Sequence, residues 1–329
     1  MKTKSQHGVA IITALLIVAL AATTATYLLW QQSLWTRQVE NLMARAKANA
    51  IAQAGAQLAR GQLNEFADTK MIYQFLGKEL PLPAEGASLV GMMVDEQSKF
   101  NINNLVYGNI PAAPTAPSPT PPPTNANNTN APKNPGPPAK TLTNQDIFKA
   151  LLKELKLADS LLDNVMAWID ETGQQQDDLT YLAKDPPYRS AHRRMVDINE
   201  LYRVKDFTPE IVEKLRPYLT ALPANTPLNV NTAPENLLEA SGLKPAVVAD
   251  IIKKREATPF LKKEDLDKVL NGAPLPPTVD FTSRYFVASG RVTNGNVDIG
   301  YSALLERQTA GSTPNTEWPR IIWLQQGTE

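Results

Sequence analysis

The chain has 329 residues, a length that allows two or three domains of ordinary size. Its 33 basic and 33 acidic side chains cancel, which argues against a general electrostatic affinity for nucleic acid. The absence of cysteine excludes disulfides, thiolate metal sites and cysteine nucleophiles, and two histidines, His7 and His192, are too few for a multi-histidine zinc site.

The N-terminus combines a short basic leader with a long apolar segment. Lys2 and Lys4 precede residues 9–30, which carry no charge and, at about 1.5 Å per residue, can span the hydrocarbon core of a membrane. The first charge after this segment is Arg37. The positive-inside rule therefore predicts that the leader is cytoplasmic and that everything after Trp35 lies outside the cytoplasm.

Three interpretations of this segment compete. A secretory signal would be cleaved at the small residues 19–21, but the apolar run continues well beyond them. An uncleaved anchor helix follows from hydropathy alone. The third interpretation is cleavage between Gly8 and Val9, at the boundary between polar and apolar residues, which would leave the apolar helix intact.

The pattern downstream favours one long helix. Apolar residues continue at intervals of three and four from Trp35 to Leu58, and no proline interrupts residues 9–80. We expect a helix from about Val9 to about Leu63, half in the membrane and half amphipathic.

Two β-rich segments flank a helical one. Residues 71–107 contain an apolar run at 90–94 and a polar–apolar alternation at 99–103, whereas residues 281–324 include the hairpin signal Asn294-Gly295. Between them, residues 110–140 are expected to be disordered, because eleven of residues 111–140 are prolines. Residues 141–275 carry helix caps and helical periodicity. The helices expected there begin with the box Thr143–Asp146 and continue at 159–170, 208–214, 234–240, 245–255 and 262–269.

Residues 228–266 resemble a helix-hairpin-helix unit. Gly242, Pro245 and Arg255 match its core, while Lys244 stands where a second glycine would let the backbone approach a phosphate. A structural scaffold is therefore the preferred interpretation, with phosphate binding as the alternative. Residues 196–201 echo residues 228–232 and suggest a degenerate second copy.

Four carboxylates, among them Asp170, Asp177 and Asp178, lie within nine residues. Oxygen ligands of this kind bind Ca²⁺, but the spacing is not that of an EF-hand, so a solvated acidic loop is the alternative. No phosphate loop, nucleophile elbow or metalloprotease motif is present, and we expect no enzymatic activity.

Taken together, these segments resemble the large minor pseudopilins of type II secretion systems, the K family. The resemblance is nearly full length. Its most specific parts are Gly8-Val9 with the apolar helix, residues 100–105, 167–170, 186–189, 217–223 and 229–233.

The resemblance implies removal of the leader by prepilin peptidase, methylation of Val9, and a place in the inner membrane with the C-terminal domain in the periplasm. It also implies a position at the pseudopilus tip above the major pseudopilin, with minor pseudopilins I and J, and contact with secreted substrates. Calcium in the acidic loop is implied too, at Asp170, Asp177 and Asp178. The fifth residue after the cut, Thr13, lacks the carboxylate that most pilin-like subunits use to pair with a neighbour's terminal ammonium.

The expected fold class is therefore α+β: a long transmembrane helix packed on an antiparallel sheet, with an inserted all-α domain of helix-hairpin-helix or SAM-like type. The alternative function is a membrane-anchored DNA receptor. The expected boundaries are a leader at 1–8, an N-terminal helix at 9–65 with its membrane span at 9–30, a pilin-like domain at 66–109 and 276–329, the disordered insert at 110–140 and the α-helical domain at 141–275.

Overall fold

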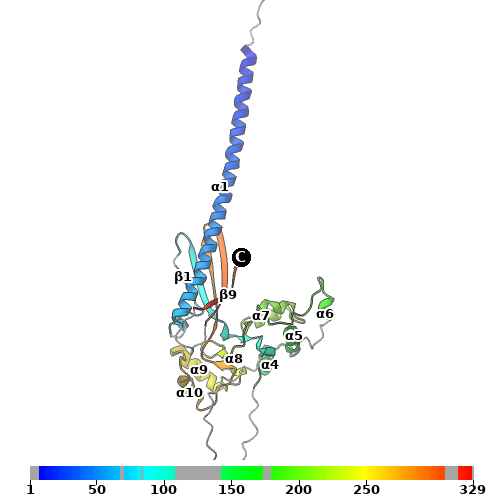
Figure 1. Cartoon of the computed structure of the whole chain (residues 1–329), viewed down its shortest axis with the longest axis vertical. Coiled ribbons are helices and arrows are strands. Elements are labelled where there is room, and N and C mark those ends of the chain that lie inside the picture. The colour runs from blue at the N-terminus through cyan, green and yellow to red at the C-terminus, as the bar shows by residue number, and fades with distance from the viewer. Residues whose placement is uncertain are drawn as a thin grey trace, which may run out of the picture.

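The computed structural model describes residues 7–66, 70–82, 84–107, 142–172, 179–307 and 318–327. Its first element is the helix α1, which spans His7–Phe66 and contains the predicted long helix. Residues 11–43 of α1 are largely exposed, and this part projects away from the rest of the chain as a single rod (Figure 1). The proline-rich segment predicted at 110–140 lies outside the described residues.

The C-terminal half of α1 packs on one face of a five-stranded antiparallel sheet. The strand order is β1-β2-β7-β8-β9. Ala48, Ala52 and Ala56 are fully buried at a spacing of four, so one stripe of methyl groups faces the sheet and lets the helix approach closely. The strands are β1 (Leu80–Leu82), β2 (Ser88–Asp95), β7 (Tyr285–Asn294), β8 (Val297–Glu306) and β9 (Arg320–Gly327).

The hairpin between β7 and β8 forms one residue later than its sequence signal suggested. Asn294 is the last residue of β7 and pairs with Val297, so the two loop residues are Gly295 and Asn296. Gly295 has a φ of +60°, which a glycine adopts without steric cost. The Asn294 side chain instead donates to the backbone carbonyl of Ala44 and ties the hairpin tip to α1.

A helical domain is inserted between β2 and β7, which are neighbours in the sheet. It gathers at the end of the sheet opposite the projecting part of α1 (Figure 1). Its elements include η1 (Glu96–Ser98), β3 (Phe100–Asn101), α3 (Asn104–Tyr107), α4 (Asn144–Glu154), α5 (Ser160–Ile169), α6 (Leu179–Leu182), η2 (Ile198–Arg203), α7 (Pro209–Leu215), β4 (Leu219–Thr220), β5 (Leu228–Asn229), α8 (Glu235–Ala240), α9 (Pro245–Ala257), α10 (Lys263–Leu270) and β6 (Val279–Asp280).

Local signals account for most helix starts in this domain. The predicted capping box forms at α4, where the Thr143 side chain and the Asp146 side chain each bond the other residue's backbone N–H. The Thr208 hydroxyl caps α7, and Pro245 occupies the first turn of α9. A separate hydrophobic core forms here, including Phe148, which stacks on Phe100 with ring centroids 6.0 Å apart.

The alternation at 99–103 was wrongly interpreted as part of the main sheet. Only Phe100 and Asn101 form a strand, β3, and it pairs in parallel with β4 of the helical domain. Both side chains are buried. Asn101 can be buried although it is polar, because its amide donates to the backbone carbonyl of Ala224. The β-rich prediction for 71–107 also overlooked a short helix, α2 (Lys70–Phe75), beside α1.

The end of the sheet where β8 finishes carries an ion-pair cluster around Glu306, whose side chain is largely buried whereas those of Arg284 and Arg320 are 39% and 72% exposed. The Glu306 carboxylate accepts hydrogen bonds from Tyr285 Oη at 2.9 Å, Arg284 Nη2 at 2.9 Å and Arg320 Nε at 3.2 Å. Burial and the neighbouring carboxylate raise the pKa of Tyr285 to about 12. Burial opposes ionisation of Glu306, but the bonds from Arg320 and Tyr285 prevail and lower the pKa of its carboxyl.

A pH dependence follows for the Glu306→Gln variant. Because the folded-state pKa of Glu306 lies below its unfolded value of about 4.3, its contribution is present above that pH and is lost as pH falls through the folded value. We expect the variant to be less stable than the wild type at pH 7 and to lose less stability on acidification. Thermal unfolding of the full chain in detergent at pH 7 and pH 3 measures both, and an equal acid loss in the two chains would contradict the assignment.

Candidate functional site

The first functional element is the N-terminal part of α1. The described helix contains a segment with a mean hydropathy of 2.1 and none of it buried, long and apolar enough to cross a membrane. The hydroxyls of Thr24 and Thr26 donate to backbone carbonyls four residues earlier, at 2.7 and 2.8 Å, so these polar groups are satisfied within the helix. Tyr27 and Trp30 lie together near the end of the apolar segment, as expected of side chains at a membrane interface.

The predicted processing site lies at the start of this helix. Gly8 and Val9 fall in the first turn of α1, and Thr13 follows on its exposed surface. The geometry therefore places the three predicted positions on a projecting segment, away from the folded domain.

The second functional element is a buried polar joint between the sheet and the helical domain, formed by Asp95, Glu96 and Gln97. Asp95 Oδ2 accepts from Asn229 Nδ2 at 2.8 Å, Ser283 Oγ at 2.8 Å and Thr232 Oγ1 at 2.5 Å. Its Oδ1 accepts from the backbone N–H of Gln97 at 2.9 Å. Burial raises the pKa of Asp95, and these four hydrogen bonds oppose that increase without cancelling it.

Glu96 and Gln97 add hydrogen bonds to the helical domain and to the residue before β7. Glu96 Oε2 accepts from the Thr220 hydroxyl at 2.6 Å, in the helical domain. The Gln97 amide donates to the carbonyl of Pro227 at 3.1 Å and accepts from the backbone N–H of Arg284 at 2.6 Å. The turn at the end of β2 thus connects the sheet to the helical domain through buried hydrogen bonds, some of them to carboxylates. These bonds fix the orientation of the helical domain on the sheet.

The helical domain contains two structurally similar units, each organised by a pair of buried asparagines. Asn103 donates to the carbonyl of Met195 at 3.0 Å and accepts from its N–H at 2.8 Å. Asn231 forms the same reciprocal pair with Phe260, at 2.9 and 2.8 Å. In each unit the preceding asparagine, Asn101 or Asn229, accepts from the backbone N–H of the second.

This arrangement corrects the repeat suggested by the sequence. Each unit begins in a two-residue strand of a parallel pair, β3 with β4 and β5 with β6. The structural counterpart of residues 228–231 is therefore 100–103. Residues 198–201, which resemble them in sequence, lie in the 3₁₀ helix η2.

The helix-hairpin-helix residues adopt a hairpin whose arginine points inward. Gly242 takes a φ of +96° at the turn before α9, and Lys244 and Pro245 are exposed at the start of that helix. Arg255 Nη1 donates to the carbonyls of Val230 at 2.7 Å and Ala233 at 2.6 Å. Its guanidinium thus supports the turn after β5 and adds no charge to the exposed start of α9, where a phosphate would lie.

The acidic segment is described only in part. Both carboxylate oxygens of Asp170 accept from the Thr172 hydroxyl, at 2.7 and 2.9 Å. Asp177 and Asp178 lie outside the described residues. Within the described part of the chain no group of three His, Cys, Asp or Glu side chains is placed to hold a metal ion, so calcium at these aspartates stays a prediction.

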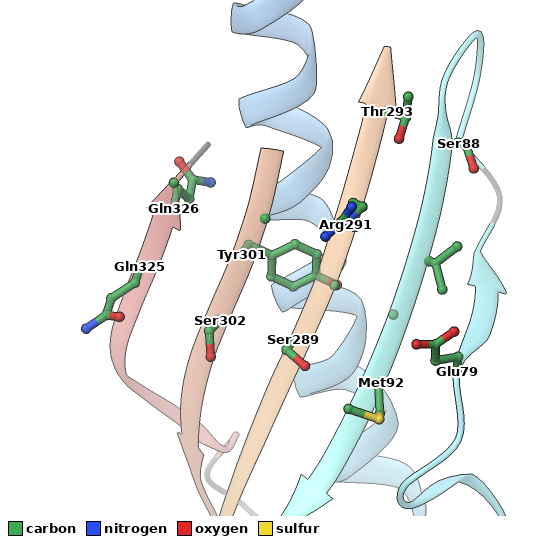
Figure 2. A pocket seen from close by; sticks show the side chains of 15 residues that line it. Glu79, Ser88, Met92, Ser289, Arg291, Thr293, Tyr301, Ser302, Gln325 and Gln326 are labelled. Carbon is green, nitrogen blue, oxygen red and sulfur yellow. The ribbon is translucent and has the colours of Figure 1, made fainter. Parts of the chain in front are cut away.

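The outer face of the sheet, opposite α1, forms an open groove of 740 Å³. Figure 2 shows Ser289, Ser302 and Gln325 on successive strands, with Met92 and Arg291 beside them. Hydroxyl and amide side chains dominate, as on the solvated face of an antiparallel sheet. Nothing in this groove resembles a catalytic arrangement of a nucleophile and a base.

Comparison with known proteins finds similarity to one family. A sequence profile described as type II secretion system (T2SS), protein K, matches residues 98–224. Type II secretion system protein K of Pseudomonas aeruginosa is 26% identical over 284 residues, covering 81% of this chain and 78% of that protein. The protein of the same name from Pectobacterium carotovorum subsp. carotovorum is 26% identical over 326 residues, covering 91% of this chain and 92% of that one. This chain is similar to type II secretion system protein K over most of its length.

The fold agrees with this similarity. A chain in the crystal structure of the GspK-GspI-GspJ complex from the enterotoxigenic Escherichia coli type 2 secretion system matches with a TM-score of 0.62 at 19% identity. The match covers 89% of this chain and all of that chain. The anchor helix, antiparallel sheet and inserted helices expected of the K family are thus confirmed.

The joint is not predicted from the sequence. Its one visible signal is the run of two acids and an amide, Asp95, Glu96 and Gln97, directly after an apolar segment, which is unusual at the end of a buried strand. Their partners Asn229 and Ser283 are more than a hundred residues away, so the contacts become visible only in three dimensions.

Proposed function

We propose that this minor pseudopilin caps the type II secretion pseudopilus, primes its assembly and supports export of folded proteins across the outer membrane. The observation that carries the proposal is the insertion of a whole helical domain between the adjacent strands β2 and β7. Such a domain adds bulk at the end of the sheet opposite the anchor helix, where a further subunit of a fibre would have to stack. The role requires no enzymatic chemistry.

The orientation in the membrane is part of this proposal. Lys2 and Lys4 on the near side of the apolar segment favour a cytoplasmic leader, with the folded domain in the periplasm. The solved relative was crystallised with GspI and GspJ, and we propose two smaller pilin-like subunits of those types as this chain's partners.

Co-purification tests the proposal directly. The full chain, extracted in detergent from cells that express the whole secretion system, should retain two smaller pilin-like proteins. The rival interpretation, a DNA receptor, predicts duplex binding that weakens with salt. Submicromolar duplex binding at physiological salt, without the two proteins, would overturn the proposal.

Processing is predicted between Gly8 and Val9. Removal of eight of the 329 residues leaves 329 − 8 = 321 residues with a methylated Val9. Gly8→Leu should block the cut, because a large side chain would stand where the peptidase accepts a small one. Intact-mass analysis of the membrane protein reads both results, and cleavage near Ala21 would instead identify an ordinary secreted protein.

Thr13→Glu is predicted to alter assembly without altering the folded domain. A lone glutamate at bilayer depth costs several kcal/mol unless it is paired, and the nearest cation would be a neighbouring subunit's terminal ammonium. The variant should therefore insert poorly or pair with a subunit that the wild type does not contact. Secretion assays and cross-linking report either result. Thr13→Gln is the uncharged control, and wild-type behaviour of Thr13→Glu would show that the missing carboxylate does not determine position.

A further inference from the structure

Arg255 combines partial burial with an incomplete set of partners. One nitrogen, Nη1, is fully used by the carbonyls of Val230 and Ala233. A guanidinium carries five N–H donors, so three remain for Nε and Nη2. Burial lowers the pKa of Arg255, and the charge of Glu256 only partly offsets that effect.

No carboxylate in the described part of the chain forms an ion pair with Arg255. Glu256, the adjacent residue, acts on it only through the electric field. Asp95 lies across the same cleft, but each of its oxygens already accepts hydrogen bonds, three of them at Oδ2. Partly buried arginines are commonly paired with an acid, because a carboxylate recovers part of the lost hydration energy.

Arg255 is one of the residues that line a cleft of 410 Å³ between the sheet and the helical domain. Leu76 and Val94 contribute apolar surface from the sheet side. Thr232 and Pro259 contribute from the helical side, and Ser98 is the last residue of η1. The volume and the mixture of apolar walls with a few converging polar groups are typical of small ligand sites.

We propose that this cleft is a carboxylate-binding site in which Arg255 is the anion-binding residue. The ligand class is a carboxylate, either a free organic acid or an acidic side chain of a docked protein. It would accept hydrogen bonds from Nε and Nη2, a side-on geometry that suits the two oxygens of a carboxylate. Arg255 would then bind the ligand while Nη1 keeps the turn after β5 in place.

The test uses arginine modification by phenylglyoxal, mapped by mass spectrometry on the full chain in detergent. Two probes are compared at matched ionic strength: glutarate, and a blocked pentapeptide with a central glutamate. At about twice its dissociation constant a probe occupies two thirds of the sites, so modification of Arg255 should slow about threefold. The exposed Arg203 is the internal control and should be modified at an unchanged rate.

A charge variant gives a second, independent readout. Glu256 is exposed beside Arg255, so Glu256→Gln removes a like charge from the ligand's surroundings without touching the core. Loss of the Glu256 charge should increase the protection of Arg255 by a carboxylate probe about threefold, the effect of one unit charge a few ångströms away in water. Glu264→Gln, an exposed acid in the first turn of α10, is the matched control and should leave the protection unchanged.

The outcomes separate the sources of the ligand. Protection by glutarate identifies free acids as occupants, and protection by the glutamate peptide alone identifies a protein side chain. The proposal is overturned if neither probe protects Arg255, if the corresponding glutamine peptide protects equally, or if Arg203 is protected to the same extent. It is also overturned if Arg255 resists phenylglyoxal without any probe while Arg203 reacts, because its N–H groups would then be inaccessible.

Discussion

Replacing Asp95 with asparagine is expected to lower the free energy of unfolding by about 3 kcal/mol, although the two side chains have the same shape. Both carboxylate oxygens of Asp95 accept hydrogen bonds, so the NH₂ group of the new amide faces a hydrogen-bond donor whichever oxygen it replaces. Placed at Oδ2 it meets the Asn229 amide, and placed at Oδ1 it meets the backbone N–H of Gln97. Asn229 cannot turn to accept, because its own oxygen already accepts from the N–H of Asn231. At least one buried donor is therefore left without an acceptor.

Thermal or urea unfolding of the full chain in detergent measures this loss. Asp298→Asn is the matched control, because Asp298 is an exposed residue of β8 whose ion pair with Arg291, at 3.3 Å, is open to water. Exposed pairs of this kind contribute about 0–1 kcal/mol. Equal losses in the two variants would show that the joint at Asp95 has no special role in stability.

The joint also shows where prediction from sequence reaches its limit. The long helix, the flanking β segments and most helix starts were predictable, since periodicity, caps and prolines act within a few residues. The Asp146 box is one example, because both of its partners lie within one turn. By contrast, Asp95 meets Thr232 and Ser283 only after the domain between them has folded.

The asparagine motifs were visible in the sequence, but their role was not. Alternation of polar and apolar residues indicates a half-exposed strand only when the polar side chains face water. Here Asn101 and Asn103 bond backbone groups in the interior, so the same alternation belongs to a buried segment in which only Phe100 and Asn101 form a strand. The true counterpart of 228–231 lies more than a hundred residues upstream, and its sequence FNIN matches LNVN at both asparagines and in apolar character at the other two positions. The nearer segment that was predicted as the second copy, 196–199, matches only one of the two asparagines.

The docking of α1 depends on a second feature that no periodicity reveals, the fit of Tyr301 between two glycines. A Cβ atom at Gly55 of α1 would lie 2.6 Å from the Tyr301 hydroxyl oxygen, and one at Gly290 of β7 would lie 2.6 Å from its ring. Tyr301 is itself largely buried, and burial raises the pKa of its hydroxyl. The absent side chains let a large aromatic ring fill the space between helix and sheet.

Gly290→Ala is accordingly expected to destabilise the fold by about 3 kcal/mol or more. Its Cβ would also lie 2.5 Å from the backbone carbonyl oxygen of Val90, which cannot move without separating β2 from β7. Gly300→Ala on the neighbouring strand is the control. There the nearest atom is the carbonyl oxygen of Gly327 at 3.8 Å, an ordinary contact, and the change should be within about 0.5 kcal/mol of neutral.

A double-mutant cycle with Tyr301→Val separates the two causes of strain. The closest contacts of a Cβ at Gly55 are all with Tyr301, so Gly55→Ala should cost much less once the ring is gone. Gly290→Ala should remain destabilising in the same background, because the clash with the carbonyl of Val90 persists. Unfolding of the three single and two double variants in detergent gives both coupling energies. Equal rescue of the two glycine variants would mean that the carbonyl can yield and that the ring alone determines how closely α1 packs on the sheet.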